Sequence, residues 1–156
     1  MESKMIPSAH YQVSEIDLVY KTKIKASERP QITTSSDAYE ILKQSWDENK
    51  IEFVEQFKIL FLNRANKVLA LYEVSTGGIT GTVVDIRLIF AAALKMNATS
   101  IVLAHNHPSS NTKPSDADLQ LTLKIKEAGK FLDIKVLDHI IVTVENYFSF
   151  ADEGEI

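Results

Sequence analysis

Two histidines and an aspartate in the middle of the chain have the residue types and the spacing of a catalytic metal site. His105 and His107 follow the apolar run 100–104, which predicts a short buried strand. Side chains alternate between the two faces of a strand, so both imidazoles are expected to point the same way. Asp118 is predicted to lie on the first turn of a helix whose N-cap is Ser115. Two imidazoles and one carboxylate leave a fourth position for water, and catalytic zinc is held in this manner.

Each part of this set also has an ordinary structural explanation. A histidine pair in a strand is more often structural or exposed than bound to a metal, and acidic residues after a helix N-cap also complement the helix dipole. The full string, H-x-H-x7-S-x2-D around a loop bounded by Pro108 and Pro114, is a much rarer coincidence. We therefore interpret His105, His107 and Asp118 as ligands of Zn²⁺.

The same string resembles the JAMM signature of the MPN/JAB metalloprotease superfamily. The flanking words His-Asn-His-Pro-Ser (105–109) and Asp-His-Ile-Ile-Val (138–142) resemble the RadC-like branch, although Ser110 stands where such chains usually have glycine. The resemblance runs from about Ser35 to Glu153. It implies an α/β fold in which helices flank a mixed central sheet, a layered arrangement shared with cytidine deaminases. It also implies zinc-dependent hydrolysis, often of a peptide or isopeptide bond.

Hydrolysis by a metal-activated water also requires a carboxylate that lies near the metal without binding it. In the JAMM family this group is a glutamate upstream of the histidines, at the start of a strand. The resemblance favours Glu55, which directly precedes an apolar run; Glu73 is the alternative, and Glu52 is a third candidate. For Ser115 the resemblance implies a hydroxyl that hydrogen-bonds the oxyanion, in addition to its N-cap role.

Three polar residues close to these positions receive structural interpretations. Asn106 should point away from the two histidines, so its expected role is local structure. His139 lies between apolar residues, as a core histidine with satisfied hydrogen bonds would. The alternative is that it supports a ligand histidine through Asp138.

Apolar periodicity predicts the elements that must position these residues. Helices are expected from Ser35 to Trp46, over 85–95, and from Ser115 past Ala128 with a C-cap near Gly129. Strands are expected over 16–21, 52–62, 68–75 and 100–104, with one or two more between 135 and 144, and a turn at 63–67 joins a hairpin. We divide the chain into an N-terminal arm or edge strand (1–34) and a RadC-like JAB/MPN domain (35–156).

Composition limits the function classes. The 156 residues are 45% hydrophobic, as in an ordinary globular domain, and the absence of cysteine excludes disulfides and thiolate metal sites. No apolar run approaches the ~20 residues of a membrane span, and no basic-then-apolar leader is present, so we expect a cytoplasmic protein without membrane contact.

Charge bears on the substrate. There are 17 basic and 21 acidic residues, and the net charge of −4 does not support non-specific nucleic-acid binding. The resemblance implies a peptide or protein substrate. The alternatives are a RadC-type nucleic-acid-processing or DNA-repair protein and a non-catalytic metal-binding module. Basic side chains gathered at the metal cleft would favour nucleic acid, and the candidates are Arg64, Lys67, Arg87 and Lys113.

Overall fold

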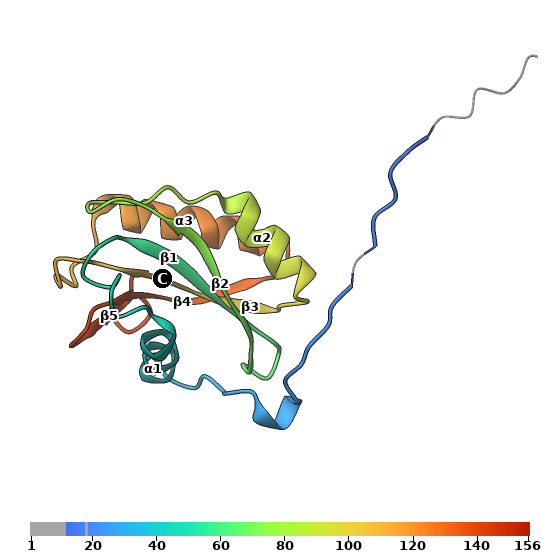
Figure 1. Cartoon of the computed structure of the whole chain (residues 1–156), viewed down its shortest axis with the longest axis horizontal. Coiled ribbons are helices and arrows are strands. Elements are labelled where there is room, and N and C mark those ends of the chain that lie inside the picture. Colours follow the sequence, from blue (N-terminus) through green and yellow to red (C-terminus); the bar gives the residue numbers. More distant parts are fainter. Residues whose placement is uncertain (1–11, 18) are drawn as a thin grey trace, which may run out of the picture.

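The computed structural model describes residues 12–17 and 19–156, and its centre is one five-stranded sheet (Figure 1). The strands lie in the order β2-β1-β3-β4-β5. Their bounds are β1 Gln56–Leu62, β2 Val68–Thr76, β3 Ser100–Asn106, β4 Lys135–Val142 and β5 Tyr147–Ser149. The helices are α1 Ser35–Ser45, α2 Ile86–Lys95 and α3 Asp116–Phe131, preceded by a short 3₁₀ turn, Ala26–Glu28. This architecture confirms the predicted α/β fold with a mixed sheet.

The sheet is mixed because only one neighbouring pair of strands is parallel. β1 runs antiparallel to both β2 and β3, and β4 runs antiparallel to β5. β3 and β4 are parallel, and α3 forms the crossover between them. The C-terminal end of β3 is thereby brought close to the first turn of α3, which is the junction where the predicted metal ligands lie.

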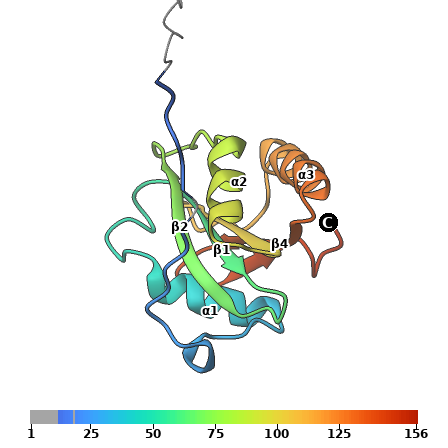
Figure 2. The same ribbon diagram turned by 90° about the vertical axis from the view of Figure 1, so that its right-hand side faces the viewer.

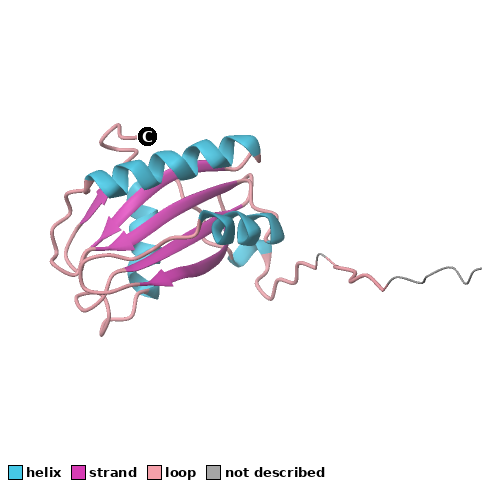
Figure 3. Cartoon of the chain, turned by 90° about the horizontal axis from the view of Figure 1, so that it is seen from above, coloured by secondary structure: helices cyan, strands magenta, loops and turns pink. Residues whose placement is uncertain are grey.

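Helices cover both faces of the sheet. α1 packs on one face, while α2 and α3 lie together on the other (Figures 2 and 3). All seven residues of β1 are buried because this strand is covered on both faces. Leu60 and Leu62 point toward α1, whereas Phe57 and Ile59 point toward α2 and α3. Alternate residues of β1 therefore pack against α1 on one face of the sheet and against α2 and α3 on the other.

The strand predicted over 16–21 is wrong for the residues that the structure describes. Residue 18 lies outside them, and residues 16, 17 and 19–21 form no strand. Alternating hydrophobicity is a local signal, but a strand exists only where a neighbour accepts its hydrogen bonds. Ile16 is 83% exposed and Val19 is 52% exposed, so neither joins the core. Backbone pairing with the domain begins later, where the carbonyl of Pro30 accepts from the amide of Val68 and the amide of Ile32 donates to the carbonyl of Asn66.

Two other predicted boundaries differ from the structure. The strand expected from residue 52 begins at Gln56, because two successive backbone turns that begin at Asp47 occupy residues 47–54. α3 continues past Gly129 to Phe131, so this glycine is not the C-cap. A Cβ at Gly129 would overlap the carbonyl oxygen of Ile134, which shows that the glycine is needed for a close approach of the following chain.

Among the described residues, the helices are too short or too polar to cross a membrane.

Candidate metal centre

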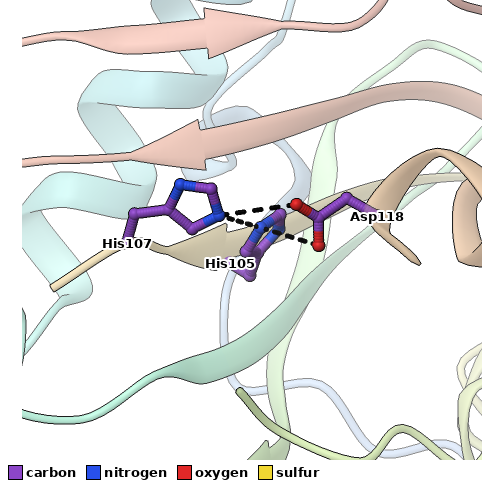
Figure 4. A group of neighbouring side chains, drawn as sticks. All are labelled: His105, His107 and Asp118. Carbon is purple, nitrogen blue, oxygen red and sulfur yellow. Dashed lines mark hydrogen bonds and ion pairs between the residues drawn. The ribbon is translucent and has the colours of Figure 1, made fainter. Parts of the chain in front are cut away.

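His105, His107 and Asp118 converge on one point at the C-terminal end of the central strand β3 (Figure 4). The two imidazoles come from the C-terminal end of β3 and the loop that follows it, and the carboxylate comes from the first turn of α3. The Nε2 atoms of His105 and His107 lie 2.9 Å apart. The oxygens of Asp118 lie 3.4 Å from Nε2 of His105 and 3.5 Å from Nε2 of His107. The expected common orientation of the two histidines is confirmed.

The hydrogen bond on the far side of His107 identifies the nitrogen that faces this point. Nδ1 of His107 lies 2.6 Å from the carbonyl oxygen of Asn111. A carbonyl only accepts, so Nδ1 carries the proton, and Nε2 of the neutral ring presents a lone pair to the cluster. Burial opposes a charge on His107, but Asp118 and the Asn111 carbonyl raise its pKa above the ordinary value.

Asp118 is held in place by the start of its own helix. Its Oδ2 accepts a hydrogen bond from the backbone N–H of Ser115 at 2.8 Å, and its own N–H donates to Oγ of Ser115 at 3.1 Å. This reciprocal pair is a capping box, which confirms the predicted N-cap role of Ser115. Burial raises the pKa of Asp118, but the two imidazoles outweigh it and hold the pKa far below its usual range. Asp118 is therefore an ionised carboxylate in a fixed orientation.

This donor set fits a divalent ion. The Nε2 atoms of the two histidines lie close together beside the ionised carboxylate of Asp118, an arrangement that suits a cation between them. In a tetrahedral zinc site with bonds of about 2.0–2.1 Å, ligand atoms lie about 3.3 Å from one another. The distances of 2.9, 3.4 and 3.5 Å in the cluster bracket that value. Two imidazoles and one carboxylate are also the ligand types that suit Zn²⁺.

Glu55 lies in the same cleft as the three ligands. The cleft has a volume of about 650 Å³, and its walls include Glu55, Ser115 and all three ligands. Burial raises the pKa of Glu55, the two histidines partly oppose this, and the negative charge of Asp118 adds to it. Glu55 therefore lines the same cleft as His105, His107 and Asp118 and interacts electrostatically with all three.

The other two candidates for the general base, Glu73 and Glu52, are less well placed than Glu55. Glu73 pairs with Lys58 in the β1–β2 register and accepts a hydrogen bond from the side chain of Gln56, so it lies on the α1 face of the sheet. Its alternative role as the base near the metal is therefore inconsistent with the structure. Glu52 lines the outer part of the cleft and is exposed.

Asn106 connects the ligand strand to the segment that carries Glu55. It points to the face opposite His105 and is fully buried. Its Oδ1 accepts from the backbone N–H of Gln56 at 2.7 Å, and its Nδ2 donates to the carbonyls of Ile51 at 2.7 Å and Val54 at 2.9 Å. The residue between the two histidines thus holds the backbone on both sides of Glu55. The local structural role expected for Asn106 is present, and it reaches across 50 residues of sequence.

Sequence reasoning missed the direct partner of His105. Nε2 of His139 lies 2.7 Å from Nδ1 of His105, so His139 contacts His105 directly, without Asp138 as an intermediate. Asp138 instead accepts from the amides of His139 and Ala151 and from the hydroxyl of Ser149. Burial raises the pKa of Asp138 and lowers that of His139 well below its ordinary value.

Of the four basic residues that would suggest a phosphodiester substrate, only Lys113 lines the cleft. Arg87 instead pairs with Asp85 at the start of α2, at 2.8 Å. The Nζ of Lys67 donates to the carbonyl of Ala26. The described part of the cleft wall therefore lacks a basic cluster.

Comparison with known proteins agrees with this geometry. Residues 32–155 match the RadC-like JAB domain family. The chain belongs to this family. A "UPF0758 protein" of Flavobacterium johnsoniae is 49% identical over 124 residues, which cover 80% of this chain and 53% of that protein. A "UPF0758 protein" of Chlorobaculum parvum is 40% identical over 125 residues, covering 80% of this chain and 54% of that protein.

The family match covers all five strands and all three α-helices of this RadC-like JAB domain. A relative from Clostridium botulinum, also named a "UPF0758 protein", is 36% identical over 144 residues, which cover 92% of this chain and 61% of that protein. The chain spans about half the length of the first two curated relatives. None of these names states an activity.

Proposed function

We propose that this RadC-like JAB domain is a zinc-dependent hydrolase that cleaves peptide or isopeptide bonds. The observation that carries the proposal is the convergence of two imidazoles and an ionised carboxylate beside a second carboxyl group, Glu55, that lies outside their cluster. His105, His107 and Asp118 would hold the ion. When bound, Zn²⁺ acidifies a water molecule and polarises the carbonyl of the substrate.

Side chains of the cleft transfer the proton and stabilise the developing negative charge. Glu55 accepts the proton of the attacking water and passes it to the departing amine nitrogen, because it lies beside the ligands without taking part in their cluster. Partial burial supports this role, since it raises the pKa of Glu55 toward that of an effective base. Ser115 lines the same cleft, and its hydroxyl donates to the oxygen on which negative charge develops.

A peptide amide is favoured over a phosphodiester by the charge of the cleft. Three acidic side chains, Glu52, Glu55 and Asp118, line it together with one lysine, Lys113. Bound Zn²⁺ and Lys113 together would only balance these three carboxylates, so the cleft has no positive excess to attract a polyanion, whereas a neutral amide backbone needs none. Peptide, isopeptide and DNA substrates should therefore be screened together, with and without a chelator. Metal-dependent cleavage of DNA alone would overturn the peptide assignment.

Glu55→Gln tests the assignment of the base. We expect the variant to keep close to one zinc per chain while its turnover falls by about 10²–10⁴-fold, the usual contribution of a general base. Glu52→Gln is the matched control, because it changes a second carboxylate of the same cleft and should leave turnover nearly unchanged. A Glu55→Gln protein as active as wild type would show that another group takes the proton.

His107→Ala tests the ligand set. Loss of one of three protein ligands should reduce zinc to far below one ion per chain, as measured by elemental analysis after dialysis. Retention of a full equivalent of zinc would show that the ion binds elsewhere.

A further inference from the structure

His139 is a fully buried histidine whose two ring nitrogens both have partners close to the metal centre. Its Nε2 lies 2.7 Å from Nδ1 of His105, and its Nδ1 lies 2.6 Å from Oγ1 of Thr122. The ring stacks on Phe150 with their centroids 4.5 Å apart. It is 0% exposed, so no solvent competes for either nitrogen.

The hydroxyl of Thr122 fixes the direction of this hydrogen-bond chain. Oγ1 of Thr122 lies 2.6 Å from the carbonyl oxygen of Asp118 and also 2.6 Å from Nδ1 of His139. A hydroxyl has one proton to donate, and the carbonyl can only accept. If Thr122 donated to His139, two oxygens would face each other at 2.6 Å without a proton between them. Thr122 therefore donates to Asp118, and Nδ1–H of His139 donates to Thr122.

The same direction then holds for the ligand histidine. With its proton on Nδ1, His139 presents the lone pair of Nε2 to His105, so Nδ1 of His105 must carry the proton of that bond. Nε2 of His105 is left with a lone pair that faces Nε2 of His107 and the Asp118 carboxylate. The chain from His105 through His139 and Thr122 ends on the backbone of Asp118, another residue of the cluster.

We propose that His139 is a positioning residue that holds His105 in its metal-binding tautomer, and that Thr122 fixes the direction of the hydrogen bonds through which His139 does so. The proposal rests on the metal site of the proposed function. It does not depend on which bond the protein hydrolyses. Groups that orient ligand histidines in this way change metal affinity by about 10–100-fold when they are removed.

Two matched pairs of variants separate this role from core packing. His139→Phe keeps an aromatic ring beside Phe150 but has no acceptor for His105, whereas His139→Gln retains both an acceptor and a donor. Thr122→Val removes the hydroxyl at nearly constant volume, and Thr122→Ser keeps it. A role in packing alone predicts that zinc affinity follows ring shape; the proposed role predicts that it follows the hydrogen bonds.

The measurement is the Zn²⁺ dissociation constant by chelator competition, with each variant's fold checked by urea unfolding in a chelator. We expect His139→Phe and Thr122→Val to bind Zn²⁺ about 10–100-fold more weakly than wild type. His139→Gln and Thr122→Ser should stay within a few-fold of wild type. Wild-type affinity in folded Thr122→Val and His139→Phe would overturn the proposal.

Nitrogen-15 NMR of the metal-free wild-type protein tests the tautomer directly and needs no variant to fold. We expect the nitrogen without a proton in His139 to be Nε2. A proton on Nε2 of His139 would overturn the proposal whatever the affinities show. A protein that binds Zn²⁺ as described but cleaves no amide would refute only the proposed hydrolase activity.

Discussion

Replacing Asn106 by leucine should loosen the segment that carries Glu55 while leaving the metal ligands in place. Leucine has the same branched side-chain shape as asparagine, with bulkier terminal groups, so the buried site stays filled. It cannot accept from the amide of Gln56 or donate to the carbonyls of Ile51 and Val54, which Asn106 does at 2.7, 2.7 and 2.9 Å. His105 and His107 point to the opposite face and keep their own partners.

The size of the effect follows from the three lost partners. A buried polar group that loses its partner costs about 1–3 kcal/mol. The three groups belong to one network, so their costs do not simply add. The segment 47–55 lies at the surface, where water can reach some of the freed groups. We therefore expect the free energy of unfolding to fall by about 2–4 kcal/mol.

Urea unfolding in a chelator measures this loss, and hydrogen exchange of the Gln56 amide shows whether the segment is released. Zinc content should stay near one ion per chain while turnover falls, because Glu55 is no longer held beside the ligands. Ser100→Ala is the control. Ser100 lies in the same strand as Asn106, and its buried hydroxyl has no hydrogen-bond partner, so its removal should lower the free energy of unfolding only slightly. Stability within 0.5 kcal/mol of wild type, with the Gln56 amide still protected, would refute the reasoning.

Three further changes test other parts of the fold. Ser110 has φ of 64°, so Ser110→Gly should raise the free energy of unfolding by up to about 1 kcal/mol in urea titrations, and a decrease would contradict this. Hydrogen bonds from Thr33 and Thr34 lower the pKa of Asp37 to about 2, so its stabilisation is present above pH 4 and lost as the pH falls through 2. The difference in stability between wild type and Asp37→Asn should therefore shrink on acidification; a constant difference would refute the linkage. Gly129→Ala should lower the melting temperature through overlap with the Ile134 carbonyl, although helix propensity alone predicts a gain of about 1 kcal/mol and hence a higher one.

Local signals were sufficient for the parts of the fold that depend on neighbours in sequence. The start of α3 follows from Ser115 and Asp118, whose capping box needs only four consecutive residues. The strand over 16–21 shows the limit of such signals, because alternation cannot reveal whether a partner edge exists. β1 likewise begins later than its apolar pattern suggests, since contacts with Asn106 hold residues 51–54 in turns.

The sequence by itself determined which residues form the cluster, because strand period and helix capping place His105, His107 and Asp118 within a few residues of one loop. Only the tertiary structure decided what surrounds them. Strand register sends Glu73 to the opposite face, and the long-range hydrogen bonds of Asn106 hold the segment that carries Glu55 at the cleft. Parallel pairing of β3 with β4 brings His139 against His105, 34 residues away in sequence. Register and pairing depend on the packing of the whole sheet, and no short stretch of residues encodes them.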